Sequence, residues 1–172
     1  MSPPGSPPVR VVVTDTNILI NLIHAGLLDL LAKLSPYIFV VPEEVVKEVS
    51  DPHQSQALQE ALSRGVLQVV QLTDPAELTI FAHLLTILGT GEAACLSLAE
   101  CRKWLIASDE KKKFRREALA RLGNARMLNT PGILILAIKA GVLTIEEADN
   151  AKTILEHHRF TMNFTSFRDV LS

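Results

Sequence analysis

The sequence predicts a three-layer α/β/α sandwich with a mainly parallel sheet of about five strands and a helical C-terminal tail. Short runs rich in Val, Ile and Leu do not alternate with polar residues, which is typical of strands covered on both faces. Longer stretches of helical periodicity follow most of these runs, as in a βα alternation. The chain has 172 residues, of which 48% are hydrophobic. This is enough for the core of one domain.

The predicted elements alternate from residue 10 onward. Strands are expected at 10–14, 37–41, 67–72 and 104–108, with a weaker fifth at 125–129. Prolines in first turns and glycines after last turns mark several helix ends. The helices between the strands are expected at 17–34, 42–49, 54–64, 75–88, 91–101 and 111–122. Helices at 131–140 and 144–157 form the tail, and the second opens with TIEE, a capping-box pattern.

The domain organisation is expected to be simple. Residues 1–8, MSPPGSPP, lack the periodicity of a fold and predict a disordered, Pro-rich leader, whereas residues 9–172 predict a single domain. The leader has no apolar core typical of a secretion signal or membrane anchor. The longest later apolar run, 132–143, is too short to span a bilayer and contains Lys139. We therefore expect a cytoplasmic protein that does not associate with a membrane.

Charge is distributed unevenly along the chain. The net charge of −2 argues against general polyanion binding. Between Arg102 and Arg121, however, eight Lys and Arg face only three acids, and most of them lie in the run KKKFRR. Such a run is commonly a solvated helix face, but it also suits a nucleic-acid backbone.

Two aspartates follow predicted strands in the same way. Asp15 ends VVVTD and Asp109 ends LIASD, so each comes after an apolar run and a small hydroxyl residue. The carboxyl ends of parallel strands meet at one edge of a sheet, where ligands bind in open α/β folds. Each aspartate alone is also explained as a helix cap. Two of them at one edge make a shared site worth testing.

Glutamates in two predicted helices add to this edge. Glu44 and Glu48 are four residues apart and share one helix face after the second strand. Glu92 lies in the first turn of an otherwise small and apolar helix, LGTGEAACLSLA. Glutamates in first turns also complement the helix dipole, and Glu48 is alternatively a solvated side chain.

Gathered carboxylates repel one another unless a cation neutralises them. Oxygen ligands without His or Cys suit Mg²⁺ or Mn²⁺, and the sequence contains no Cys/His cluster with ligand spacing. The two cysteines are six residues apart and predict reduced thiols. The acids therefore predict one site for one or two divalent ions.

Four ordered motifs resemble the PIN domain, a metal-dependent ribonuclease fold, and in particular its prokaryotic branch. They are VVVTDTNILINLIHAGLLDLL, VVPEEVVKEV, LGTGEAACLSLAE and WLIASDE, and the resemblance spans about residues 10–140. It implies that Asp15, Glu48, Glu92 and Asp109 are the catalytic, metal-binding acids. It leaves Glu110 as an alternate to Asp109, because the family often has two acids at the fourth position, and Glu44 is a further alternate ligand. Supporting side chains implied near the site are Thr16, Asn17 and Ser108.

The implied activity is hydrolysis of RNA phosphodiester bonds by a metal-activated water, which leaves a 5′-phosphate and a 3′-hydroxyl. Basic residues beyond the fourth acid would then bind the RNA backbone: Lys111, Lys112, Lys113, Arg115 and Arg116. Many small prokaryotic members are toxins of toxin–antitoxin pairs, which implies an antitoxin partner, and many form homodimers.

Other interpretations differ in the residues that they require. A haloacid-dehalogenase-like phosphatase needs a second Asp at the position of Asn17, and a receiver-type domain needs an acidic pair and a late lysine that RMLNTPG does not supply. The remaining alternative is a catalytically silent PIN-like scaffold that binds RNA or protein. The complete set of acids argues against it.

Overall fold

The structure, a computed structural model, describes residues 4–171 and contains a five-stranded parallel sheet in the order β3-β2-β1-β4-β5. The strands are β1 (Arg10–Thr14), β2 (Tyr37–Pro42), β3 (Gln68–Val70), β4 (Leu105–Ala107) and β5 (Met127–Leu128). All four pairings are parallel. The predicted strands are confirmed in position, and β3, β4 and β5 are shorter than expected.

β1 is the centre of the sheet. Val12 pairs with Phe39 of β2 on one side and with Leu105 of β4 on the other, and neither Val12 nor Val13 is exposed. The chain adds β2 and β3 on one side of β1 and then crosses to add β4 and β5 on the other. Such a reversal opens a crevice at the carboxyl ends of the two strands that flank it, here β1 and β4.

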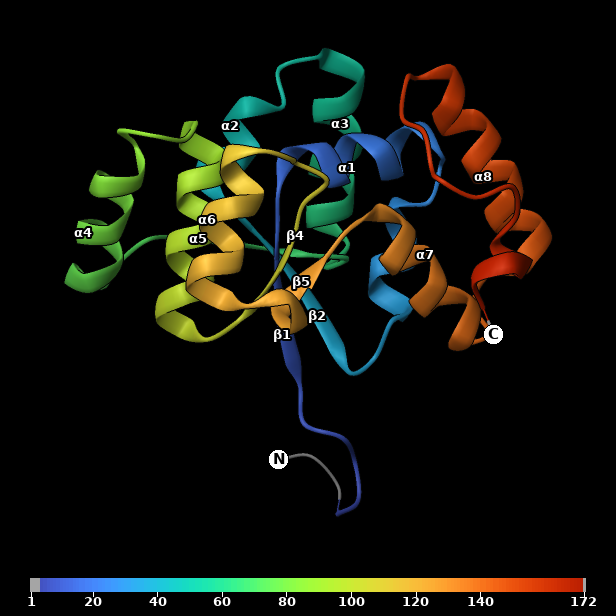
Figure 1. Ribbon diagram of the computed structural model, residues 1–172, viewed down its shortest axis with the longest axis horizontal. Helices are drawn as coiled ribbons and strands as arrows, with labels where there is room; N and C mark the ends of the chain where they lie inside the picture. The colour runs from blue at the N-terminus through green and yellow to red at the C-terminus, as the bar shows by residue number, and fades with distance from the viewer. Residues whose placement is uncertain (1–3, 172) are drawn as a thin grey trace.

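Helices cover both faces of the sheet, which confirms the three-layer α/β/α architecture (Figure 1). One face carries α1 (Thr16–His24), α3 (Pro52–Ser63), α7 (Thr130–Lys139) and α8 (Ile145–His157). The other carries α4 (Pro75–Leu84), α5 (Thr90–Arg102) and α6 (Lys113–Leu122), and α2 (Glu43–Glu48) follows β2 directly. Residues 93–99 of α5 are all buried. This explains why that helix consists of small and apolar residues.

The predicted helix 17–34 was wrong as a single element. Helix α1 ends at His24, and a 3-10 helix, Leu28–Lys33, follows after a turn. Gly26 at the turn has φ +69°, a left-handed conformation that glycine adopts without the strain a side chain would bring. The N–H of Leu27 bonds back to the carbonyl of Leu22, which closes the end of α1. Apolar residues continue on both sides of the turn, so periodicity alone did not show it.

The tail is helical in part. After α8, residues 158–166 have no regular helix, and a short 3-10 helix, Phe167–Val170, follows. Another short 3-10 helix, Asn124–Arg126, precedes β5. Of the predicted leader, residues 1–3 lie outside the described residues, and residues 4–8 show a turn followed by irregular chain. No helix within residues 4–171 has both the length and the apolar character needed to cross a membrane.

Candidate active site

Asp15 lies at the carboxyl end of the central strand and is only 2% exposed. It is the N-cap of α1, and its Oδ1 accepts a hydrogen bond from the N–H of Thr16 at 2.8 Å. Its Oδ2 accepts from the Ser108 hydroxyl, at the end of β4, at 3.0 Å. Burial raises the pKa of Asp15 to about 7, and Glu92 and Glu110 add to this shift against the two hydrogen bonds. The helix-cap role is therefore real, but it does not neutralise this carboxylate.

Glu48 is held beside Asp15 by two other elements. Its Oε2 accepts from the Thr16 hydroxyl at 2.8 Å, and its Oε1 accepts from the backbone N–H of Gly91 at 2.7 Å. Gly91 leaves the space that this carboxylate occupies, because a Cβ there would lie 2.8 Å from Glu48 Cδ. The last residue of α2 is thus fixed between the starts of α1 and α5.

Glu92 and Glu44 extend the acidic cluster. Burial raises the pKa of Glu92, and the negative charges of Glu110 and Glu48 raise it further. Glu44 Oε2 is buried and has no hydrogen-bond partner among the described residues. The thiol of Cys95 lies within the field of four acids, Asp15, Glu48, Glu44 and Glu92, and burial is the main reason that its pKa is raised.

Asp109 has the most hydrogen bonds of the four predicted acids. Its Oδ1 accepts from the N–H of Thr130 at 2.8 Å, and its Oδ2 accepts from the Asn21 amide at 2.9 Å and from the Thr130 hydroxyl. Burial raises its pKa against these donors. The carboxylate of Asp109 thus joins the loop after β4 to the second turn of α1 and to the start of α7, through Asn21 and Thr130, which the sequence did not single out.

Glu110, the predicted alternate, is the acid after β4 whose charge acts on Asp15 and Glu92. Its side chain is exposed and accepts from the Asn17 amide at 2.9 Å, while Asn17 Oδ1 accepts from the backbone N–H of Asp109 at 3.1 Å. Asn17 therefore positions the loop that carries both acids. The backbone N–H of Glu110 donates to the Ser108 hydroxyl at 3.1 Å, so Ser108 links it to Asp15.

At the carboxyl edge of the sheet, the charge of Glu110 acts on Asp15, Glu92 and Asp109, and the charge of Glu48 acts on Glu92. Glu44 joins Asp15, Glu48 and Glu92 in acting on the Cys95 thiol. None of these acids forms an ion pair with a Lys or Arg within residues 4–171. Within the same residues, no three His, Cys, Asp or Glu side chains converge tightly enough to hold a metal ion as they are placed. Oxygen ligands, uncompensated charge and the raised pKa of Asp15 nevertheless fit a divalent cation.

The predicted RNA-binding residues follow the site in sequence and lie at the start of α6. Lys111, Lys112, Lys113, Arg115 and Arg116 are all exposed, and none pairs with a carboxylate in the described part of the chain. Their free charges border the acidic edge on one side.

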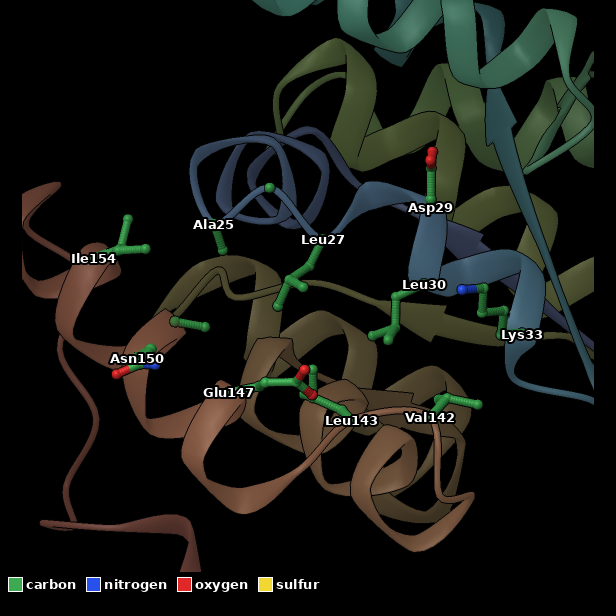
Figure 2. A pocket seen from close by; sticks show the side chains of 12 residues that line it. Ala25, Leu27, Asp29, Leu30, Lys33, Val142, Leu143, Glu147, Asn150 and Ile154 are labelled. Atoms are coloured by element: carbon green, nitrogen blue, oxygen red, sulfur yellow. The ribbon is translucent and has the colours of Figure 1, made fainter.

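A separate hollow of about 370 Å³ lies between the turn after α1 and α8 (Figure 2). Asp29 and Lys33 border it from the 3-10 helix, and Glu147 and Asn150 border it from α8. It adjoins the end of α1 opposite to Asp15, and none of the predicted site residues lines it. This hollow therefore does not belong to the acidic site.

Sequence reasoning missed three residues that shape the site: Asn21, Gly91 and Thr130. A signal for Thr130 was present, because NTPG follows the fifth strand and polar residues after parallel strands meet at one edge. Asn21 lies one helical turn after Asn17, on the same face of α1. Gly91 matters through a close approach of two helices, which no local pattern reports.

Comparisons with known proteins report the family and the fold of the chain. A family model described as a PIN domain matches residues 11–171. Among solved structures, one similar chain comes from the crystal structure of VapBC2 from Rickettsia felis bound to a DNA fragment from their promoter. It is 20% identical, with a TM-score of 0.50, and the match covers 70% of this chain and 98% of that one. This likeness supports the fold alone. No curated protein matches the chain.

Proposed function

This chain belongs to the PIN domain family, and from that premise we propose that it is a divalent-metal-dependent ribonuclease. The reaction is hydrolysis of an RNA phosphodiester bond by an activated water. One observation carries the proposal: Asp15 is buried at the switch point of the sheet, with a pKa of about 7, among acids that no Lys or Arg of the described chain neutralises. A fold gains nothing from such an arrangement unless a cation or a proton occupies it.

Mg²⁺ or Mn²⁺, as one ion or two, would be held by Asp15, Glu48 and Glu92 together with an acid from the loop after β4. Of the two acids in that loop, Glu110 is the better candidate, because its charge acts on Asp15 and Glu92 whereas Asp109 is engaged by Thr130 and Asn21. Convergence on an ion requires side-chain rotation of the half-buried Glu92 and the exposed Glu110. When bound, the ion supplies an activated water and neutralises charge on the phosphate.

The chain's own residues keep the acids in place. Thr16 and the N–H of Gly91 fix both oxygens of Glu48, and Ser108 fixes one oxygen of Asp15. Asn17 orients the loop of Asp109 and Glu110 by bonding to both residues. Fixing the ligands in this way lowers the cost of assembling the site when substrate binds.

The exposed charges of Lys111, Lys112, Lys113, Arg115 and Arg116 support RNA as the substrate. They adjoin the acids and can neutralise the phosphates on one side of the bond to be cut. The cytoplasm is the proposed location of this activity.

We extend the proposal to partners. The similar Rickettsia felis structure is titled as VapBC2 bound to promoter DNA. By analogy, this chain would act as the toxin of a toxin–antitoxin pair, and a homodimer is the proposed assembly. Co-expression with a small neighbouring gene and co-purification of its product would test the pairing.

A silent PIN-like scaffold that binds RNA or protein is the second candidate. It is favoured by the finding that no three potential ligands converge at metal-binding spacing within residues 4–171. Cleavage assays separate the two functions.

The first experiment incubates the purified chain with a mixed RNA pool and Mn²⁺ or Mg²⁺. We expect cleavage by the wild type, no cleavage with EDTA, and a rate lower by at least about 100-fold in Asp15→Asn. The control is Asp29→Asn, which removes only an exposed ion pair with Arg64 and should cleave normally. Equal RNA products from the wild type and Asp15→Asn would support the scaffold.

A second pair of variants assigns the fourth ligand. Glu110→Gln should raise the Mn²⁺ concentration needed for half-maximal cleavage about tenfold and leave the melting temperature unchanged. Asp109→Asn should lower stability by about 1–3 kcal/mol, because an NH2 donor replaces Oδ2, the acceptor for the Asn21 amide and the Thr130 hydroxyl. If Asp109→Asn raised the Mn²⁺ concentration needed for half-maximal cleavage and Glu110→Gln did not, Asp109 would be the ligand.

A further inference from the structure

A groove of about 540 Å³ begins at the acidic edge and extends under the C-terminal segment. Asp109 and Glu110 line it from the acidic edge, Lys111 and Arg115 line it from the loop after β4 and from α6, and residues 160–164, called the far wall, line it from the C-terminal segment. Its volume lies in the range of small-ligand sites, about 300–1,000 Å³. The groove is thus continuous with the candidate active site and is distinct from the hollow in Figure 2.

The far wall is anchored at both ends. Before it, the ring of His158 stacks on His24 of α1, with centroids 3.7 Å apart and an interplanar angle of 13°. After it, the Ser166 hydroxyl and the Phe167 N–H donate to the carboxylate of Asp149 on α8 at 2.7 and 2.8 Å. A wall fixed in this way costs little ordering entropy when a ligand binds.

The apolar residues of the wall have different surroundings. Met162 and Phe164 pack on the hydrophobic core, and Phe164 meets the buried Phe167 ring edge to face at 4.9 Å between centroids. Phe160 lines the groove and is half-buried, but it is not among the residues packed on the core. Its ring has no aromatic partner within residues 4–171. Core packing therefore explains Phe164 and leaves Phe160 available to a ligand.

The groove combines three kinds of side chain. It is lined by two acids, by two exposed cations without carboxylate partners in the described chain, and by an aromatic ring. A nucleotide joined to the phosphate being cut has groups that match the cations and the ring: a phosphate for Lys111 and Arg115, and a base for Phe160. Aromatic rings that stack on unpaired bases are the usual way to bind single-stranded RNA.

We propose that this groove is the subsite for the unpaired nucleotide next to the cleaved bond, with Phe160 as its stacking platform and Arg115 as its phosphate contact. The proposal rests on the proposed ribonuclease function, because it names single-stranded RNA as that site's substrate. A peptide segment is the competing occupant, but the two unpaired cations and the ring favour a nucleotide.

The test measures binding without cleavage. Short single-stranded RNAs, each with one 2-aminopurine at a different position, are titrated into the full chain in EDTA, and both fluorescence quenching and anisotropy are recorded. We expect quenching at one position, which reports stacking. Phe160→Leu should abolish the quenching and weaken binding about tenfold, and Phe160→Tyr should restore both.

Arg115→Ala should weaken binding and reduce the slope of log K against log salt by about one. The matched control, Lys139→Ala, removes an exposed cation at the far end of α7 and should change neither. Melting curves of all variants check that Phe160→Leu and the two alanine variants remain folded at the temperature of the binding assay.

The outcomes separate the subsite from the nuclease. In one outcome, the wild type cleaves RNA, but the wild type and Phe160→Leu bind RNA equally and neither quenches 2-aminopurine fluorescence. This result would overturn the subsite and leave the ribonuclease proposal standing. Quenching that depends on Phe160, in a chain that cuts no RNA with any metal, would support the subsite and overturn the nuclease. Binding of a basic peptide that depends on Phe160, without RNA binding, would assign the groove to a protein partner.

Discussion

Asp15 has the environment least suited to a carboxylate in this chain. Burial raises its pKa to about 7, two other acids add to this shift, and only two hydrogen bonds oppose it. At residue scale the site is therefore destabilising to the fold at alkaline pH, and a proton or a cation relieves this cost. Such a cost at a functional position is a common trade between stability and activity.

This gives a stability prediction. Between about pH 4 and 7, folded Asp15 holds a proton that the unfolded chain has lost, so its contribution to stability falls as pH rises through this window. In EDTA, the wild type should lose up to about 4 kcal/mol of unfolding free energy at this residue between pH 4 and 8. Asp15→Asn should lack that loss, and Mg²⁺ at pH 8 should stabilise only the wild type. Urea titrations measure both effects, and parallel pH profiles for the two proteins would contradict the argument.

Part of this residue-scale detail was predictable and part was not. The strand-then-aspartate pattern located Asp15 correctly, because an apolar run followed by a polar residue marks a strand end. The same pattern at Asp109 and Glu110 could not show how the partners of the two acids differ. That depends on Thr130 and Asn21, which reach Asp109 from distant elements.

At the scale of elements, the site depends on how closely α5 approaches the end of α2. The N–H of Gly91 donates to Glu48 at 2.7 Å, and no side chain fits between them. The glycine of the GEA motif is thus explained by a packing requirement between two helices, in addition to any local preference.

Gly91→Ala should therefore move Glu48 and lower the cleavage rate about 10- to 100-fold, with a smaller relative change in melting temperature. Gly89→Ala is the comparison variant, because its Cβ would leave Glu48 untouched and would meet the end of the proposed ligand Glu92, at 3.2 Å, so it reports the effect of a small shift of Glu92 alone. The test compares the cleavage rates of the two variants and the wild type at saturating Mn²⁺. Equal activity of Gly91→Ala and the wild type would remove Glu48 from the site.

At the scale of the whole molecule, the tail is tied to the sheet domain through the His24–His158 stack. Burial and the charge of His158 lower the pKa of His24, and Asp51 opposes them. The stack's stabilising effect is therefore present above the ordinary His pKa of 6.5 and is lost as pH falls below it. The wall of the groove, residues 160–164, follows this contact directly.

Lowering the pH from 7.5 to 5.5 should thus raise deuterium exchange in residues 159–164, after correction for intrinsic rates. His158→Phe keeps a stacking ring without a titrating charge and should weaken this pH dependence. Hydrogen–deuterium exchange mass spectrometry of the wild type and His158→Phe at both pH values measures this difference. The same increase in both would show that another group controls the segment.

The overall architecture was predictable from sequence because parallel strands and the helices between them have strong local patterns, as in residues 10–14 and 37–41. Contacts between distant residues were not. His24 and His158 are in contact only because α8 returns to α1, and Gly26 ended a helix that its apolar neighbours continued. Local periodicity reports elements and their order, whereas such contacts arise from tertiary packing.

The central position of β1 also matters while the protein is being made. Asp15 leaves the ribosome early, but β4, Ser108 and Glu110 are translated much later, and until then β1 lacks one neighbour. A truncated or still-growing polypeptide therefore cannot assemble the acidic edge. If the enzyme cuts RNA as proposed, its own messenger is safe from the nascent chain until the residues as far as Glu110 have been translated and have left the ribosome.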